Sequence, residues 1–277
     1  MSERKSSKIA KYLCALLCVL IIIFPIYWMI IGSFKTQAEA YSFPPKLFPE
    51  TLTLDNYINA FQEYNVVVYL KNSLIVTAFV VVLSVIIAAL AAYAMSFFRF
   101  KLKTTITTSL YLLQLLPTIT MLVPLFSLYR VMGLQNTYAS LIITYVASVS
   151  GVPIALVLMS GYFSSIPKEL FESAGIDGAG TMRTFVKILL PLAAPGIVCT
   201  AIYIFVQTWQ EFMFAVNLVT DPDMYTLPVG LQMFVGLRTT DWGGMMATST
   251  MIAIPAIILF VCVQNYFVDN LAGAVKQ

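Results

Sequence analysis

Long apolar runs alternate with short polar segments along this chain. Six runs reach the roughly 20 residues that a membrane-spanning helix needs. They cover about 12–34, 74–97, 105–129, 138–162, 188–219 and 245–267. The first run is longer than the roughly 7–15 apolar residues of a signal peptide, so we expect it to be retained as a helix. The pattern therefore predicts an all-α membrane protein with six transmembrane helices.

The composition supports a membrane protein and excludes several other classes. Of the 277 residues, 60% are hydrophobic and 10% are charged, whereas soluble domains have about 45–50% apolar and about 25% charged residues. The net charge of +3 is too small to indicate binding to nucleic acid. The chain has no histidine, and its four cysteines lie in apolar runs, so we predict no metal site and no catalytic residues.

Basic residues concentrate on one side of the predicted topology. Eleven of the sixteen precede the first run, follow the sixth, or lie between runs two and three or four and five. The opposite side has only Lys35, Lys46, Lys71, Arg130 and Arg238. Because Lys and Arg are enriched in cytoplasmic loops, we predict that both termini and the 164–191 loop are cytoplasmic.

Five of the six runs contain proline. The residues are Pro25, Pro117, Pro124, Pro153, Pro195 and Pro255. A proline inside a spanning helix frees a carbonyl group, which neighbouring helices or a wet cavity must then satisfy. We therefore expect a bundle of bent helices, which is typical of a gated path, although ordinary structural kinking is the alternative.

The polar segment 169–191, rich in small residues, separates the fourth and fifth runs. Ser165 is expected to cap a helix with Pro167 in its first turn, where the missing N–H has little effect. Asp177 and Gly178 predict a turn after this helix. The Asp177 side chain is expected to cap a second helix over 179–190, which Pro191 begins to disrupt.

Two faces of the first helix differ in chemistry. Glu169 and Glu172 lie one turn apart on one face, while Ser173, Ala174 and Gly175 keep another surface small. A small surface lets a partner's backbone approach closely, so the pattern indicates a rigid docking element. A solvated connector is the alternative interpretation.

Polar residues interrupt the fifth run near its end. Gln207, Gln210 and Glu211 are spaced to share one face of a continuous helix, and Asn217 follows. Trp209 offers a flat apolar surface on which a ligand ring could stack. Intramembrane acids usually face a bundle interior or a wet cavity. These five residues therefore define either a substrate path or a contact that holds subunits together.

The 169–191 segment resembles the EAA motif of permease subunits of ABC importers. That motif reads E-A-A, three residues, Gly, nine residues, then I-x-L-P. The matching residues are Glu172, Ser173, Ala174, Gly178, Ile188, Leu190 and Pro191. Ser173 replaces the usual alanine but remains small. With Glu169 and Asp177, these residues form the predicted surface for coupling to an ATPase.

Other segments resemble the carbohydrate-importer permeases, and the likeness covers essentially the whole chain. The segments are 72–74, 98–100, 116–118, 123–125, 133–137, 209–214 and 272–276. The family usually has Trp-Asn-Glu-Phe at 209–212, where this chain has Gln210. The resemblance implies a type I ABC importer permease fold. It divides the chain into 1–71 (N-terminal tail, first helix and extracytoplasmic segment), a permease core at 72–267 and a cytoplasmic tail at 268–277.

The resemblance also implies partners. The chain lacks the G-x-x-x-x-G-K-[ST] phosphate loop, so ATP and Mg are expected on partner ATPase subunits, with no cofactor in this chain. The implied assembly contains two ATPase subunits, a second homologous permease and an extracytoplasmic substrate-binding protein. The implied substrate is a sugar or an oligosaccharide, in a cell membrane, and no nucleic acid is involved.

Two alternatives remain open at this point. An importer permease of the same mechanism could carry another solute, such as a polyamine or a phosphate ester. An ion-coupled secondary carrier is the second alternative, but it would call for several intramembrane acids or a broken-helix ion site. It would also leave the EAA-like loop without a purpose.

Overall fold

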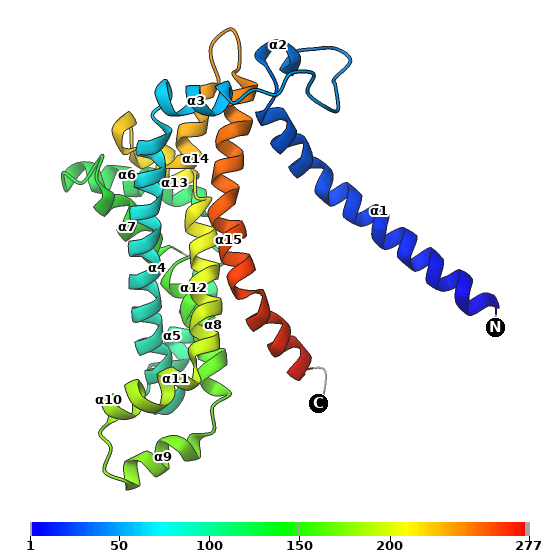
Figure 1. Cartoon of the computed structure of the whole chain (residues 1–277). Helices are drawn as coiled ribbons and strands as arrows, with labels where there is room; N and C mark the ends of the chain where they lie inside the picture. The colour runs from blue at the N-terminus through cyan, green and yellow to red at the C-terminus, as the bar shows by residue number, and fades with distance from the viewer. Residues whose placement is uncertain (1, 149, 275–277) are drawn as a thin grey trace. The chain divides into compact units, whose positions relative to one another are not determined.

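The structure, a computed structural model, describes residues 2–148 and 150–274. Across these residues the secondary structure is helical, apart from one isolated antiparallel bridge between Val235 and Thr240. The chain forms two compact units. The first contains Met1–Val67 and Gly230–Ile258, and the second contains Val68–Val229 and the end of the chain from Leu259. Figure 1 shows the order of the helices along the chain.

The first unit contains the long helix α1 (Ser2–Ser33), the short helices α2 (Gln37–Ala40) and α3 (Asp55–Gln62), the 3-10 turn η4 (Leu231–Phe234) and the first part of α15 (Trp242–Ala274). Side-chain contacts hold the polar segment that follows α1 in place. The Asn56 amide donates to the carbonyls of Ser33 and Lys35, at 2.8 and 2.7 Å. The rings of Tyr64 and Phe234 stack at 4.0 Å between centroids.

The second unit carries the rest of the helices. They are α4 (Val66–Phe97), α5 (Lys103–Leu113), η1 (Thr118–Met121), α6 (Leu122–Val131), α7 (Tyr138–Ala147), α8 (Val152–Ser164), α9 (Lys168–Ile176), α10 (Thr181–Thr184), the π-helix η2 (Phe185–Leu189), α11 (Leu190–Leu192), α12 (Ala194–Trp209), α13 (Met213–Leu218), η3 (Pro222–Met224) and α14 (Leu227–Gly230). Helix α4 begins within the first unit and α14 ends there.

Three helices among the described residues are long and apolar enough to cross a membrane without a break. They are Ala10–Ser33 of α1, all of α4, and Trp242–Cys262 of α15. Three bent helix pairs also meet the length and hydropathy criteria, each as a broken span or a re-entrant loop: α5 with η1 and α6 at 97°, α7 with α8 at 44°, and the 181–192 segment with α12 at 76°. Lipid offers backbone groups no hydrogen bonds, so apolar runs of this length fold as helices.

The six predicted spans therefore fall on three unbroken helices and three bent helix pairs, which gives six spans if each bent pair crosses the membrane once. Pro117 precedes η1, and Pro153 and Pro195 lie in the first turns of α8 and α12, so three prolines mark the breaks. Pro25 and Pro255 instead lie inside the long helices α1 and α15. In the segment predicted as a tail, 268–277, helix α15 continues to Ala274, and residues 275–277 lie outside the described residues.

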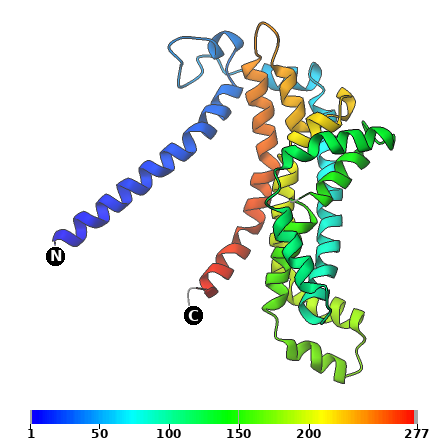
Figure 2. The same cartoon turned by 180° about the vertical axis from the view of Figure 1, so that it is seen from behind.

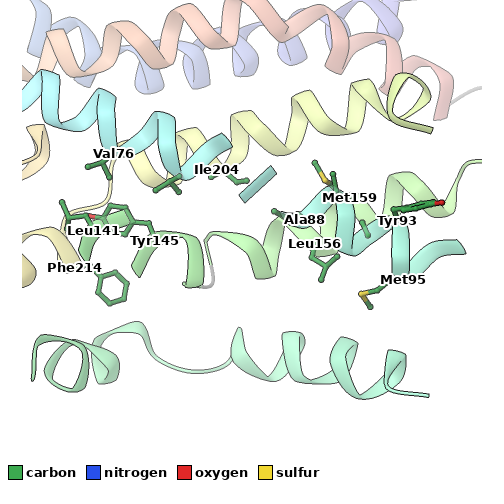
Figure 3. Close-up of a cluster of buried hydrophobic side chains, with 14 of the residues drawn as sticks. Val76, Ala88, Tyr93, Met95, Leu141, Tyr145, Leu156, Met159, Ile204 and Phe214 are labelled. Atoms are coloured by element: carbon green, nitrogen blue, oxygen red, sulfur yellow. The ribbon is translucent and has the colours of Figure 1, made fainter. Parts of the chain in front are cut away.

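The core of the second unit packs α4 against α7, α8 and α12. Small residues such as Ala88 let helices approach closely, while Met159 and Ile204 fill the space between them. Figure 3 shows these side chains converging from the separate helices. At one end of the bundle, Asn72 donates to the carbonyls of Asp223 and Tyr225, both at 2.9 Å. This contact fixes the 220–227 connection to α4.

Candidate functional site

The predicted docking element is an exposed helix with a sharply defined end. Helix α9 is closed by Gly178, whose φ is +78°. The Ala179 N–H donates to the Ala174 carbonyl at 2.9 Å, and the Gly178 N–H donates to the Gly175 carbonyl at 3.1 Å. These two bonds form a Schellman motif, which favours glycine because a Cβ is strained at positive φ. The predicted turn at Asp177 and Gly178 is therefore present.

The capping predicted around this helix was wrong. Pro167 occupies the N-cap position of α9 without a side-chain bond. The Ser165 hydroxyl instead donates back to the Tyr162 carbonyl at 2.7 Å, at the end of α8. The chain has already turned away at Pro167, so Ser165 belongs to the preceding helix. The chain therefore enters α9 through the backbone conformation of Pro167 and without the serine cap that was expected.

The second predicted helix, 179–190, is also different in the structure. It begins at Thr181, after a Gly180 N-cap that makes no side-chain bond, so Asp177 does not cap it. It continues as the π-helix η2 and the short α11, and the bend before α12 follows Pro191. The break near Pro191 agrees with the expectation, because proline cannot donate to the preceding turn.

The motif residues divide between surface and interior. Glu169, Glu172 and Ser173 are exposed, whereas Ala174 is 4% exposed. Ile188 and Leu190 are half-buried at the return to the bundle. In Figure 1, α9 lies beyond the ends of α4 and α12, next to α10. The two glutamates therefore present one polar face of α9 to its surroundings, while Ala174 faces inward.

An aromatic cluster, which the sequence analysis missed, attaches α9 to the core. Phe171 of α9 contacts Phe97 and Phe98 at the end of α4, with ring centroids 5.2 and 5.9 Å apart. Tyr93 stacks on Phe185 at 4.8 Å and donates its hydroxyl to the Thr181 carbonyl at 3.0 Å. Aromatic spacing at i and i+4 on α4 was the available signal. These contacts connect α9 directly to the end of α4.

The prediction that Gln207, Gln210 and Glu211 share one face of a continuous helix was wrong. Helix α12 ends at Trp209, with Gln210 as its C-cap, and α13 begins only at Met213. Glu211 lies in the break. Its carboxylate accepts from the backbone N–H groups of Phe214 at 2.8 Å and Ala215 at 3.2 Å. The polar residues interrupt the apolar run because the helix itself is interrupted there.

The Glu211 carboxylate also accepts a hydrogen bond from the Tyr145 hydroxyl at 2.5 Å. Tyr145 belongs to α7, is 3% exposed, and was not singled out from the sequence. Tyr138 lies two helical turns earlier on the same face, and its hydroxyl donates to the Asn72 side chain at 2.7 Å. Two tyrosines seven residues apart in an apolar helix were the signal for polar contacts on this face.

A polar cavity of about 340 Å³ opens beside this break. Gln207, Gln210 and Glu211 line it together with hydroxyl-bearing residues. Those residues are Thr118, Tyr145, Ser148, Ser150 and Thr208. Its walls among the described residues contain one carboxylate and no lysine or arginine. The cavity therefore offers a ligand hydroxyl and amide groups, one acidic group and the apolar side chains of Phe212, Met213 and Phe214.

Two of the predicted path residues lie elsewhere. Trp209 is 3% exposed, and its ring stacks on Phe205 with 5.4 Å between centroids. A protein ring therefore already occupies that face of its indole. Asn217 is exposed and donates to the Met213 carbonyl one turn earlier, at 2.7 Å. The structure brings together three of the five residues and separates these two from the cavity.

An all-helical bundle with broken spans, a polar cavity and a rigid exposed corner is the architecture of a membrane transport permease. The chain belongs to the family of binding-protein-dependent transport system inner membrane components, whose model matches residues 84–273. The protein is therefore a multi-pass inner-membrane protein, the non-catalytic permease component of a transport system.

The similarity to named relatives extends over the full length of the chain. The chain is 37% identical to the trehalose/maltose transport system permease protein MalG of Thermococcus litoralis, covering 100% of this chain and 99% of the relative. It is 34% identical to the inner membrane ABC transporter permease protein YcjP of Escherichia coli, covering 99% of each. Both relatives are named as permease proteins, and the first is named for the transport of trehalose and maltose.

A solved structure shows the same fold. A chain of a bacterial ABC transporter involved in the import of the acidic polysaccharide alginate aligns with a TM-score of 0.83 at 22% identity. The alignment covers 96% of this chain and 98% of the other. At this identity the match establishes the type I ABC permease fold and nothing about substrate.

Proposed function

We propose that this chain is the permease subunit of an ATP-driven importer for a sugar or an oligosaccharide. The observation that best supports this proposal is the full-length similarity to a trehalose/maltose permease. The hydroxyl and amide groups in the walls of the 340 Å³ cavity, beside the apolar side chains of Phe212, Met213 and Phe214, support the same class of substrate. A polyamine would call for several acidic groups, and the described lining has only Glu211. Membership of a binding-protein-dependent family disfavours an ion-coupled carrier.

The exposed face of α9 is proposed to dock in a cleft of a cytoplasmic ATPase. The Schellman corner at Gly178 fixes the direction of the chain after α9, and the ring contacts of Phe171 connect α9 to α4. A push on α9 then moves a packed helix of the core instead of being lost in a flexible loop. In this proposal ATP and Mg bind to two partner ATPase subunits.

The assembly is proposed to include a second homologous permease and an extracytoplasmic substrate-binding protein. A solved alginate transporter of the same fold is described in complex with a pentasaccharide-bound periplasmic protein. The apolar part of α1 fits the need for a second subunit or lipid, because its span is 0% buried within this chain. Both termini and the 164–191 loop are proposed to be cytoplasmic, from the distribution of basic residues.

Reconstitution tests the proposal. The chain is co-expressed with candidate permease, ATPase and binding-protein subunits from the same genome, and ATP hydrolysis is measured in proteoliposomes with individual sugars. Sugar-dependent stimulation through the binding protein is expected. Stimulation by a polyamine or a phosphate ester instead would reassign the substrate, and an absence of any associated ATPase would overturn the mechanism.

A thiol-labelling experiment tests the orientation separately. A cysteine at Ser173 should resist a membrane-impermeant reagent in intact cells, whereas one at Thr239 should react. The four native cysteines are first replaced by serine. The reverse labelling pattern would place α9 outside the cell and exclude its docking to a cytoplasmic ATPase.

A further inference from the structure

A small cavity in the first unit lies where two spans end at the same face of the membrane. The span in α1 ends at Ser33, and the span in α15 begins at Trp242. The cavity measures about 240 Å³ and contains residues from both ends. Its walls include Gly32 and Met246, which are in direct contact, and Figure 2 shows this junction from behind. The cavity therefore lies at the level of the lipid headgroups.

The cavity contains a buried cation with unused hydrogen-bonding capacity. Lys35 is 3% exposed, and its ammonium lies 4.3 Å from the centre of the Trp28 ring. It donates to the Lys46 carbonyl at 2.5 Å. An ammonium has three donors, and within residues 2–148 and 150–274 no carboxylate forms an ion pair with it. Burial lowers the pKa of Lys35 from its usual 10.5, and the charge of Glu39 opposes this effect.

An anion in the same cavity is held separately from this cation. One oxygen of Glu39 accepts from the Thr36 N–H at 3.2 Å. The other accepts from the N–H groups of Glu50 and Thr51, at 2.8 and 3.3 Å. The backbone thus fixes the carboxylate while leaving part of its acceptor capacity unused, since a carboxylate offers about four lone-pair sites. The cavity presents one positive and one negative group at separate positions.

Two indoles complete the site. Trp28 carries the Lys35 ammonium over its face, and Trp242 is 42% exposed at the start of α15. Tryptophan is enriched at membrane–water interfaces, and its face attracts ammonium groups. Below this level, exposed apolar side chains continue along both helices, for example Ile30 and Ile254. A ligand with a charged headgroup and apolar chains matches this arrangement, in which charged and aromatic groups lie above apolar side chains.

We propose that this cavity binds the headgroup of a phosphoethanolamine lipid. The phosphate oxygens accept from Lys35, the amine donates to Glu39, and the acyl chains lie along α1 and α15. A purely anionic headgroup would satisfy Lys35 but be repelled by Glu39. A choline headgroup has no N–H to donate to Glu39. The proposal concerns the first unit alone and does not depend on the transported solute.

Native mass spectrometry of the full-length detergent-solubilised chain provides the test. Palmitoyl-oleoyl phosphatidylethanolamine is titrated against the phosphatidylcholine and phosphatidylglycerol with the same chains. The expected result is one retained ethanolamine lipid, bound about tenfold more tightly than either competitor, since one charge-assisted hydrogen bond is at stake. Equal retention of all three lipids by the wild-type chain would overturn the proposal without any need for a variant.

Substitutions locate the site. Lys35→Met should weaken the retention of all three lipids, because each of them carries the phosphate that Lys35 binds, and Lys35→Arg should retain wild-type binding. Glu39→Gln should abolish the tenfold preference and let phosphatidylglycerol bind as well as phosphatidylethanolamine. Lys71→Met is the matched control, because Lys71 is an exposed lysine outside the cavity. Unchanged lipid retention in Lys35→Met together with an unchanged preference in Glu39→Gln would exclude this cavity, as would an equal loss of binding in Lys71→Met.

Soluble O-phosphoethanolamine distinguishes a lipid from a free solute. The lipid should remain bound at micromolar concentration when the soluble headgroup is added in about a hundredfold excess, because the acyl chains contribute apolar burial. Displacement of the lipid by the soluble compound at comparable concentration would contradict a lipid site and assign a site for a small zwitterion.

Discussion

The corner at Gly178 and the break at Glu211 are two interruptions of helical structure with different origins. At Gly178 the Schellman bonds join residues within five positions of each other, and the residue that must adopt φ +78° is the one that tolerates it. At Glu211 the carboxylate joins the start of α13 to Tyr145, which is 66 residues away in sequence. The first interruption is specified locally and the second by tertiary contact.

This difference predicts how each interruption responds to mutation. A locally specified corner should fail in one step when its glycine is replaced, leaving the bundle intact. A break held by several distant partners should weaken by degrees. The predictions below separate the two cases, beginning with the largest effect.

Replacement of Gly178 should abolish transport without preventing membrane insertion. Gly178→Asp puts a β-carbon at φ +78°, which strains the corner and redirects the chain after α9. Uptake of substrate by the reconstituted complex and yield of the inserted chain are the two measurements. Gly161→Ala is the matched control, because Gly161 lies inside α8 with open space at its β-carbon position and without positive φ. Wild-type uptake by Gly178→Asp, or equal loss in Gly161→Ala, would contradict a locally specified corner.

The sequence was sufficient for features that depend on neighbours along the chain. Runs of apolar residues located the spans, and the Asp177-Gly178 pair located the corner. It was insufficient where packing decides, as in the 210–212 break and the aromatic attachment of Phe171 to Phe97. The polar residues in the fifth apolar run marked this region as a candidate site. They did not predict that helix α12 ends there. The reason is that Glu211 finds its partners on α7 and α13.

Substitutions at Glu211 should lower stability in graded steps. Glu211→Gln keeps one carbonyl acceptor but cannot accept at both oxygens, so a backbone N–H or the Tyr145 hydroxyl loses its bond. Leaving one buried donor unsatisfied costs about 1–3 kcal/mol. Thermal unfolding of the purified chain in detergent is the measurement, with Asn217→Ala as a control expected within about 0.5 kcal/mol of wild type.

The graded pattern has a specific alternative. If Glu211 formed an ion pair with a partner subunit, Glu211→Gln would dissociate the complex in detergent, since an unpaired buried cation costs about 3–5 kcal/mol. Complex recovery that remains at the wild-type level supports the internal bonds seen here. Loss of the complex together with unchanged unfolding of the isolated chain would instead assign Glu211 to the subunit interface.

The polar cavity should affect substrate affinity more modestly than either interruption affects function. Gln207→Ala and Gln210→Ala each remove one neutral hydrogen-bonding group from the lining. A neutral hydrogen bond contributes about 0.5–1.5 kcal/mol, so KM for uptake should rise about twofold to tenfold. Asn217→Ala provides the comparison, because Asn217 lies outside the cavity and bonds within its own helix. A larger rise in KM for Asn217→Ala than for both glutamines would remove the cavity from the path.

The smallest effect should come from Glu39, where local and distant bonds meet on one carboxylate. Burial by itself would raise the pKa of Glu39, but the N–H groups of Glu50, Thr36 and Thr51 and the charge of Lys46 lower it below the usual 4.5. Because the folded-state pKa is depressed, the stabilisation is present above the usual value. It is lost as the pH falls through the folded-state pKa.

Hydrogen exchange of the Glu50 and Thr51 amides measures this contribution, after correction for the intrinsic pH dependence. Their protection should fall below the usual carboxylate pKa in the wild-type chain, and Glu39→Gln should show reduced protection with no such pH dependence. Glu63→Gln, an exposed acid on the same segment, should behave as wild type. If the Thr36 cap alone held the segment, these amides would exchange equally in wild type and Glu39→Gln. In that case the bonds from Glu39 to the Glu50 and Thr51 amides would add no protection to that given by the local cap at Thr36.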